Sequence, residues 1–261
     1  MYTCGIDIGS VSTEVVILES SNGKDDVRIS SYIIAPTGAN SKIAAEKTLE
    51  KACLKAGLDR SDIGAVVATG YGRINVPFAD KNITEISCHA RGAISAFGDT
   101  KTVIDIGGQD SKVIKLEQGN PIDFLMNDKC AAGTGRFLEV MARALEIDLE
   151  HFAHIFLSTQ GHVDISSTCT VFAESEIVSL IGRGVDKNKI IRGLIYSIVS
   201  RITSMVERIG LEEPVCMTGG VAKNLGVVSA LQEKLGVKIN IPGEPQIAGA
   251  LGAAYLALDL A

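Results

Sequence analysis

Hydrophobic and polar positions follow two patterns along this chain. Short apolar runs that end in glycine or polar residues are typical of buried strands, and longer segments with apolar residues three or four apart are typical of helices. Helices are predicted over 41–57, 84–92, 134–146, 170–182, 188–209, 223–234 and 246–258, and strands over 63–69, 215–218 and 237–241. Because strands and helices alternate along the whole chain, the pattern predicts an α/β fold.

One pattern occurs twice. Residues 5–18, GIDIGSVSTEVVIL, match residues 103–116, VIDIGGQDSKVIKL, at a constant offset. Each segment is typical of a buried strand, a tight glycine turn and a second strand that returns beside the first. The repeat predicts two similarly built domains that face each other. We expect them to comprise 1–98 and 99–261, with the C-terminal helix, 246–261, packing back at their interface.

The turns of the two repeats suit phosphate binding. Gly9 and Gly107 let the backbone turn tightly and bring amides close to an anion. Asp7 and Asp105, at the strand ends, can hold the water shell of Mg²⁺. Gln109 is a candidate for orienting an attacking water, as glutamines do in some nucleotide hydrolases. Hydroxyl groups add donors to the first turn, and a third glycine turn follows another strand; these residues are Ser10, Ser12, Thr13, Gly219, Gly220 and Val221.

Two common nucleotide-binding patterns are missing from the sequence. The chain has no GxxxxGK[ST] segment, so it is not a P-loop protein. The fragment 133–135 lacks the third glycine of a dinucleotide-binding fingerprint.

Composition and charge narrow the function classes. The 261 residues are 46% hydrophobic and 21% charged, as in ordinary globular proteins, and the net charge is −6. With no basic run, nucleic acid is not expected as a partner. The longest apolar stretch, 247–258, is too short to span a bilayer, so no membrane partner is expected. The segment 1–7 has no basic leader and contains an acid, which predicts a cytoplasmic protein without a signal peptide.

Two of the six cysteines stand out by position. Cys130 and Cys169 each follow a short polar stretch and precede an amphipathic helical pattern, so each is predicted at or near a helix N-terminus. The free amides and the dipole there favour a thiolate. No CxxC pair is present, so no single local metal cluster can be drawn. The residues alone leave two hypotheses: a disulfide switch within the chain, or a redox or metal site coupled to the phosphate turns.

The remaining cysteines and the histidines have plainer interpretations. Cys4, Cys53 and Cys216 are expected to pack as small hydrophobic side chains. The adjacent pair 88–89, Cys-His, is expected to be structural, because neighbouring residues point different ways on a helix. The other histidines are expected to be solvated in a polar connecting region; they are His151, His154 and His162.

The glycine turns resemble those of the actin/hexokinase/Hsp70 ATPase superfamily. That resemblance implies two ribonuclease-H-like domains with a nucleotide cleft between them. Within that superfamily, longer strings resemble the BadF/BadG/BcrA/BcrD type, which includes the iron–sulfur ATPase activators of 2-hydroxyacyl-CoA dehydratases. The strings are NDKCAAGTGRFLEVMA, STCTVFAESE, ATGYGR (68–73), ADK (79–81), ISCHARGA (86–93), VIDIGGQDSKVI (103–114) and MTGGVAKN (217–224).

The resemblance implies a mechanism. It implies a homodimer that shares one [4Fe–4S] cluster, to which each subunit contributes Cys130 and Cys169. ATP binding and hydrolysis with Mg²⁺ would drive a low-potential electron into a 2-hydroxyacyl-CoA dehydratase, and ferredoxin or flavodoxin would reload the cluster. It also implies further nucleotide-contacting residues: Val11, Gly108, Gly133, Gln246 and Gly249.

One departure and three alternatives complete the hypotheses. A lysine is common in the family where this chain has Glu14, so a side-chain phosphate contact is not expected there. The alternatives are the activating subunit of an enzyme like benzoyl-CoA reductase, a small-molecule kinase of the same superfamily, and a non-redox ATPase scaffold. Neither a kinase nor a scaffold needs two thiols at helix starts, which favours the activator.

Overall fold

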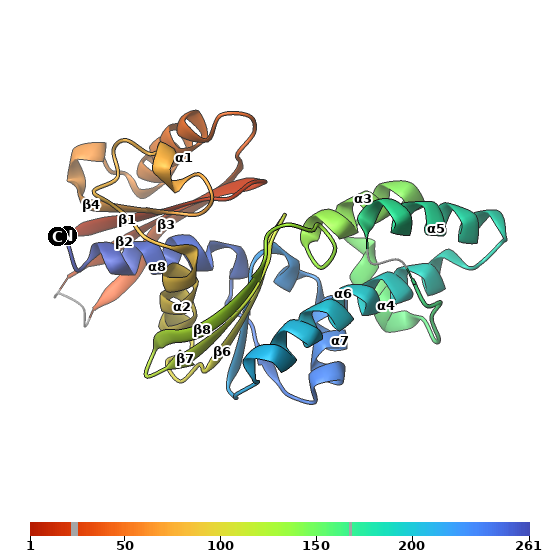
Figure 1. Ribbon diagram of the computed structural model, residues 1–261. Coiled ribbons are helices and arrows are strands. Elements are labelled where there is room, and N and C mark those ends of the chain that lie inside the picture. Colours follow the sequence, from red (N-terminus) through yellow and green to blue (C-terminus); the bar gives the residue numbers. More distant parts are fainter. Residues whose placement is uncertain (22–25, 167–168) are drawn as a thin grey trace.

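The computed structural model describes residues 1–21, 26–166 and 169–261. Within them, two five-stranded sheets have the same plan, β3-β2-β1-β4-β5 and β8-β7-β6-β9-β10 (Figure 1). In each sheet the first three strands are antiparallel and the last two add in parallel. The strands are β1 (Tyr2–Ile8), β2 (Ser12–Ser20), β3 (Val27–Pro36), β4 (Ile63–Thr69), β5 (Lys81–Asn82), β6 (Thr102–Ile106), β7 (Ser111–Glu117), β8 (Asn120–Asn127), β9 (Val215–Thr218) and β10 (Ile239–Asn240).

The repeated segments form corresponding hairpins, as predicted. In β1–β2, Asp7 lies opposite Glu14, and in β6–β7, Asp105 lies opposite Lys112. Each turn is closed by a glycine amide, which donates to the carbonyl oxygen three residues later, at 2.9 Å in the first hairpin and 3.0 Å in the second. The α/β prediction is therefore confirmed, and the two sheets have the ribonuclease-H-like strand order that the resemblance implied.

Helices fall close to their predicted ranges, with local capping that explains their bounds. The side chain of Asn40 accepts a hydrogen bond from the amide of Ile43 at the start of α1, and Gly57 ends that helix with φ of 71°. The helices are α1 (Ser41–Ala56), α2 (Glu85–Ala96), α3 (Gly135–Leu145), α4 (His151–Ser158), α5 (Thr170–Gly182), α6 (Lys187–Ile209), α7 (Leu225–Leu235) and α8 (Ala248–Ala257).

Helices α2 and α8 pack together between the two sheets (Figure 1). Their close approach depends on glycine, because a Cβ on Gly252 of α8 would overlap the backbone carbonyl of Cys88 in α2. The other face of α8 lies on β1, β2 and β4, so the last helix of the chain packs against the first sheet. The division into domains at residues 98 and 99 stays a prediction.

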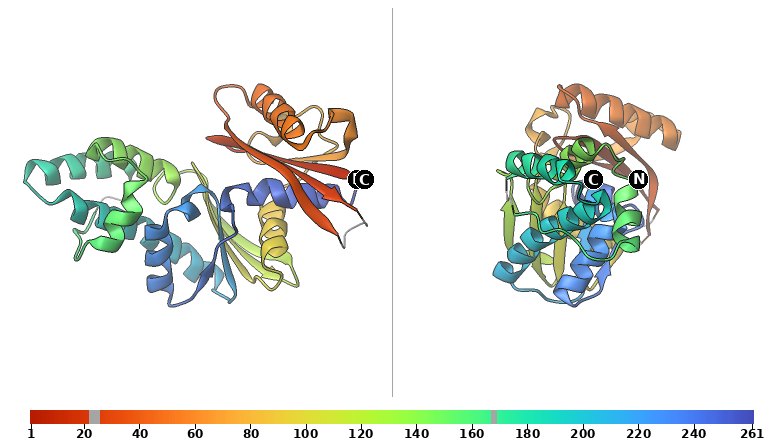
Figure 2. Two further views of the ribbon diagram at one scale, coloured as in Figure 1. Left: turned by 180° about the vertical axis from the view of Figure 1, so that it is seen from behind. Right: turned by 90° about the vertical axis from the view of Figure 1, so that its right-hand side faces the viewer.

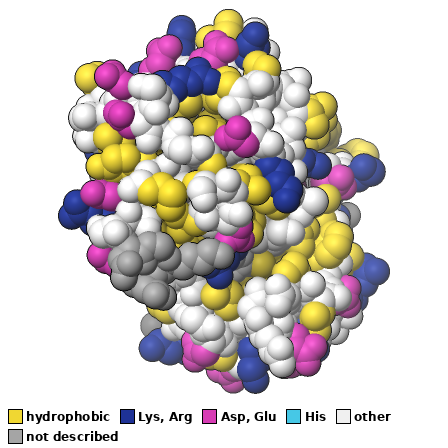
Figure 3. All heavy atoms as spheres, turned by 90° about the vertical axis from the view of Figure 1, so that its left-hand side faces the viewer, with side chains coloured by type: hydrophobic (Ala, Val, Ile, Leu, Met, Phe, Trp, Pro, Cys, Tyr) yellow, Lys and Arg dark blue, Asp and Glu magenta, His cyan; other side chains and the backbone are white. Residues whose placement is uncertain are grey.

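Helices α3 and α5 form an arm that extends from the second sheet, away from the first (Figures 1 and 2). Helix α3 packs against α5, and the apolar faces of α3 to α7 join one core with the second sheet. Both ends of the chain lie at the opposite end of the molecule, where charged side chains of both signs are interspersed (Figure 3). None of the helices in the described part of the chain is long and apolar enough to cross a bilayer.

Cys130 was predicted at or near a helix N-terminus, and it lies just before one: α3 starts at Gly135, with Thr134 as its N-cap, and the small residues between Cys130 and Thr134 form a loop. One sequence prediction is wrong. The connecting region around His151 is helical, because Phe152 and Phe156 are one turn apart and both are buried in α4. Two residues of the second cysteine segment, 167 and 168, lie outside the described residues.

Candidate functional site

A cleft of about 490 Å³ lies where the two hairpins face each other. Its walls come from both hairpin turns, the third glycine turn and the start of α3. Twelve of the sequence-predicted residues line it: Asp7, Gly9, Ser10, Val11, Ser12, Asp105, Gly107, Gly108, Gly219, Gly220, Val221 and Gln246. Sequence segments more than 200 residues apart therefore contribute to one cavity.

The glycines of the cleft allow close backbone approach. A Cβ on Gly108 would overlap the side chain of Val11, so the tips of the two hairpins touch across the cleft. Gly219 has φ of 86°, and a Cβ there would strike the carbonyl oxygen of Ile106. Larger residues would force the turns apart, which explains glycine at these positions.

The floor of the cleft holds a histidine between two carboxylates. In His89, Nε2 lies 3.8 Å from Oδ2 of Asp7, and Nδ1 lies 3.2 Å from Oδ1 of Asp105. The hydroxyl of Thr218 also donates to Oδ1 of Asp105, at 2.8 Å. Gly249 permits this arrangement, because a Cβ there would overlap the Asp7 carboxylate. The imidazole thus bridges the ends of β1 and β6, one from each sheet.

Lys112 forms a second buried charge cluster beside the floor. Its side chain is 2% exposed, and Nζ lies 2.9 Å from Oε2 of Glu85 and 3.3 Å from Oδ2 of Asp105. It also pairs with Asp110, which closes the second hairpin turn. A buried ammonium with three carboxylate partners ties α2 to both strands of that hairpin.

The electrostatics of the floor differ between its two aspartates. Burial, reinforced by Glu14 and Glu85, raises the pKa of Asp7 well above its usual range. Burial alone would also raise the pKa of Asp105, but His89 and Lys112 outweigh it and the pKa is lowered. Burial likewise raises the pKa of Glu14 to about 7. A divalent cation would relieve the excess of acidic groups around Asp7, so these residues fit Mg²⁺ with its waters.

A chain of hydrogen bonds crosses the cleft from the first hairpin to the third glycine turn. Nε2 of Gln246 donates to Oγ of Ser12 and to Oε1 of Glu14, both at 3.0 Å. Oε1 of Gln246 accepts from Nζ of Lys223 at 3.0 Å, and Lys223 also pairs with Glu244 at 2.9 Å.

Four predicted nucleotide-site residues lie elsewhere. Gln109 is exposed at the tip of the second hairpin and does not line the cleft. The buried hydroxyl of Thr13 hydrogen-bonds with that of Thr37. Gly249 lies behind Asp7 rather than on the cleft surface, and Gly133 borders a different hollow. Their roles in binding stay predictions.

Sequence reasoning missed several polar residues of the cleft, among them Glu85, His89, Lys112 and Lys223. His89 was expected to be structural. The sequence alone does not show that it lies between two aspartates, one 82 residues before it and one 16 residues after it. Lys112 could have been found from the hairpin register, since it lies opposite Asp105 in the repeat.

Only two of the six thiols are accessible on the described surface. Cys169 is the exposed N-cap of α5, and Cys130 is half-buried in the loop before α3. The other four are buried; burial raises the pKa of Cys88 and Cys216 to about 12, and raises that of Cys4 and Cys53 as well. Within the described residues, no group of three or more Cys, His, Asp or Glu side chains has an arrangement that could hold a metal ion. Two accessible thiols fit half of a four-thiolate cluster, the other half coming from a second copy.

The cleft and the Cys130 loop are physically connected. The amides of Gly135 and Arg136, the first residues of α3, donate to the carbonyl oxygens of Gly107 and Gly108 at 2.9 and 2.8 Å. The turn of the second hairpin is therefore bonded to the helix that follows the Cys130 loop. Because α3 packs on α5, whose N-cap is Cys169, both thiols are linked to this turn.

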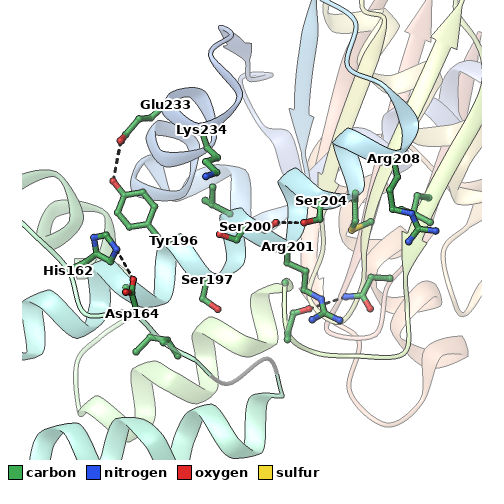
Figure 4. Close-up of a pocket in the computed structure, with 18 of the residues that line it drawn as sticks. His162, Asp164, Tyr196, Ser197, Ser200, Arg201, Ser204, Arg208, Glu233 and Lys234 are labelled. Carbon is green, nitrogen blue, oxygen red and sulfur yellow. Dashed lines mark hydrogen bonds and ion pairs between the residues drawn. The ribbon is translucent and has the colours of Figure 1, made fainter.

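A second hollow, of about 910 Å³, is lined by residues of α6, by the end of β8, and by Ala132 and Gly133 of the loop before α3 (Figure 4). One face of α6 forms its floor, where Ser197, Ser200 and Arg201 are drawn. The methylenes of Arg201 pack over Gly133, and the side chain of Asn127 holds the loop by donating to two of its carbonyls. This hollow is separate from the cleft between the two hairpins.

Two matched hairpins, a third glycine turn and paired five-stranded sheets define the class of ATPases built like actin, hexokinase and Hsp70. The chain belongs to the BadF/BadG/BcrA/BcrD ATPase family, whose model matches residues 4–257. It is 49% identical to the 2-hydroxyisocaproyl-CoA dehydratase activator of Clostridioides difficile over 260 residues, covering 99% of this chain and 96% of that protein.

Two further likenesses agree with this. The chain is 49% identical to the activator of lactoyl-CoA dehydratase of Anaerotignum propionicum over 262 residues, covering 100% of this chain and 99% of that protein. Its structure matches that of the activator of the 2-hydroxyisocaproyl-CoA dehydratase from Clostridium difficile with bound ADPNP. The TM-score is 0.92 at 48% identity, and the match covers 100% of this chain and 95% of the other.

Proposed function

We propose that this protein is an ATP-dependent activator of a (R)-2-hydroxyacyl-CoA dehydratase. In this proposal two copies share one [4Fe–4S] cluster, ATP hydrolysis with Mg²⁺ drives one electron from it into the dehydratase, and ferredoxin or flavodoxin returns the electron. The observation that carries the proposal is the bonded path from the second hairpin turn through α3 to the Cys130 loop. All six cysteines are free thiols, which suits a protein working in the reducing cytoplasm.

The cleft residues would bind and orient the nucleotide. The amides of the turns at Gly9 and Gly107 suit phosphate oxygens, and the turn at Gly219 suits the nucleoside. Asp7 and Asp105 would hold the waters of Mg²⁺ from opposite sides of the cleft. His89, between the two carboxylates, fixes their positions relative to each other.

Cys130 and Cys169 would ligate the cluster. Cys169 is the N-cap residue of α5, so the free amides and the positive end of the helix dipole lie near it and would stabilise negative charge on its sulfur. Asn127 holds the Cys130 loop through two carbonyl groups. When bound, the cluster supplies a one-electron carrier of low potential.

The coupling would run through backbone contacts. A nucleotide that moves the second hairpin must also move the first turn of α3, because the amides of Gly135 and Arg136 are bonded to it. The angle between α3 and α5 would then change, and with it the position of the thiols.

The test is anaerobic purification of the full chain. We expect a brown protein with about four irons per dimer, as one four-iron cluster requires. It should support ATP-dependent dehydration of a 2-hydroxyacyl-CoA by a dehydratase. Cys130→Ser and Cys169→Ser should each lose the iron and keep Mg·ADP binding. Cys53→Ala, at a buried thiol on α1, is the matched control and should keep both. A colourless wild-type protein, or iron content indifferent to both serine variants, would contradict the proposal.

A further inference from the structure

We propose that Lys223 is the side chain that contacts nucleotide phosphates in this cleft, and that Gln246 holds it in position. This inference rests on the proposed nucleotide binding and adds a residue that nothing above assigns to the phosphates.

The cleft needs a cation beyond those it already uses. Seven carboxyl side chains line it, against two lysines and one histidine. Lys112 is 2% exposed and surrounded by three carboxylates, so it is not available to a ligand. His89 lies between Asp7 and Asp105. A nucleoside diphosphate or triphosphate adds several negative charges, of which one Mg²⁺ neutralises two. Of the cleft residues that the structure describes, Lys223 alone offers an accessible ammonium.

The geometry brings that ammonium to the first phosphate turn. Nζ of Lys223 is bonded to one end of the Gln246 amide, and the other end is bonded to Ser12 in the turn, each at 3.0 Å. One amide group therefore separates the ammonium from the hairpin. Lys223 also pairs with Glu244 at 2.9 Å, but its side chain is 45% exposed, so it can exchange Gln246 for a phosphate oxygen without breaking a packed core.

The wall formed by the first hairpin carries a carboxyl group, which explains why the positive charge comes from Lys223 on the other wall of the cleft. Glu14, on β2 beside the first turn, is 4% exposed and accepts a hydrogen bond from Gln246. A carboxyl group there cannot attract phosphate, so the attraction must come from across the cleft. Glu14 instead accepts a hydrogen bond from the amide nitrogen of Gln246, and this orients the amide oxygen of Gln246 toward Lys223.

The experiment compares ligands with and without phosphate. In titration calorimetry on the full chain with Mg²⁺, we expect Lys223→Gln to weaken ADP binding about tenfold or more, the usual size of a hydrogen bond to a charged group. Adenosine, which carries no phosphate, should bind both proteins equally. Lys223→Met, which cannot form a hydrogen bond, should weaken ADP binding at least as much.

Two further variants separate a phosphate contact from a general change. Lys238→Gln removes an exposed lysine outside the cleft and should leave both affinities unchanged. The double variant Glu14→Lys with Lys223→Gln moves the cation to the other wall, and it should recover much of the lost ADP affinity.

The outcomes are distinct. ADP binding unchanged in both Lys223 variants would overturn the inference, as would an equal loss of ADP and adenosine affinity, which would mean that Lys223 only supports the glycine turn. A wild-type protein that binds no adenine nucleotide would instead contradict the proposed function.

Discussion

At the scale of single residues, buried charges in this protein occur in groups that balance one another. Lys112 is almost fully buried, and burial alone would lower its pKa, yet Asp105, Asp110 and Glu85 together raise it well above the usual range. Such a group keeps its charge when folded, and its removal leaves three carboxylates without their shared partner. The sequence places this lysine opposite Asp105 in the repeated hairpin, but it does not show Glu85 on α2 as a third partner.

Replacing that ammonium should therefore be costly. We expect Lys112→Met to lower the free energy of unfolding by about 3–5 kcal/mol, as when one partner of a buried ion pair is lost. The measurement is urea unfolding followed by circular dichroism. Lys115→Met is the matched control on the same strand: Lys115 pairs with the exposed Glu212, so its loss should change stability little. Equal effects of the two variants would mean that the buried cluster contributes nothing particular.

At the scale of elements, the sequence predicts the regular parts and misses the irregular ones. The two hairpins, β4 and β9, have apolar runs with clear glycine turns, and they were predicted close to their observed bounds. β8 was missed because its residues are largely exposed, so its sequence does not show the alternation of buried apolar and exposed polar residues that marks a strand. The start of α3 was predicted within one residue of its observed position, and the small residues 131–133 form the loop before it.

The candidate site likewise has a part that the sequence predicts and a part that it misses. The glycine turns are local signals, so most of their residues were predicted. The bridge of His89 between Asp7 and Asp105 depends on two sheets and α2 meeting, and no local pattern encodes that contact.

The crossing of α2 and α8 makes an element-scale prediction. A methyl group at Gly252 would press on the backbone of α2, which cannot move as a side chain can. We expect Gly252→Ala to lower the free energy of unfolding by about 1–3 kcal/mol, the usual cost of overpacking. Gly182→Ala, at an exposed helical glycine of α5 with open space around it, should instead be neutral or stabilise by up to about 1 kcal/mol. Thermal unfolding of both variants measures these changes in stability. If Gly252→Ala does not change stability, the two helices can move apart without cost.

At the scale of the whole molecule, the fold connects the cleft to the two accessible thiols through few contacts. The cleft lies where the two hairpins face each other. The accessible thiols come just before α3 and α5, the two helices that form the arm (Figure 2). The bonds of Gly135 and Arg136 to the second hairpin turn join the two regions. If nucleotide binding shifts the hairpins, this junction is where the shift reaches the arm.

The junction can be tested with one backbone amide. Proline at position 135 removes the donor to Gly107, and as the first residue of α3 it is a position where helices tolerate proline. In the wild-type protein loaded with iron, we expect a non-hydrolysable ATP analogue to change the rate at which a chelator removes iron. At saturating nucleotide, Gly135→Pro should lose most of that change. Gly135→Ala adds the same Cβ, 3.2 Å from the carbonyl oxygen of Gly107, but keeps the amide, so it should retain the change. A wild-type chelation rate that ignores the nucleotide would contradict coupling altogether. A nucleotide effect that survives in Gly135→Pro would mean that the coupling runs through contacts other than this amide.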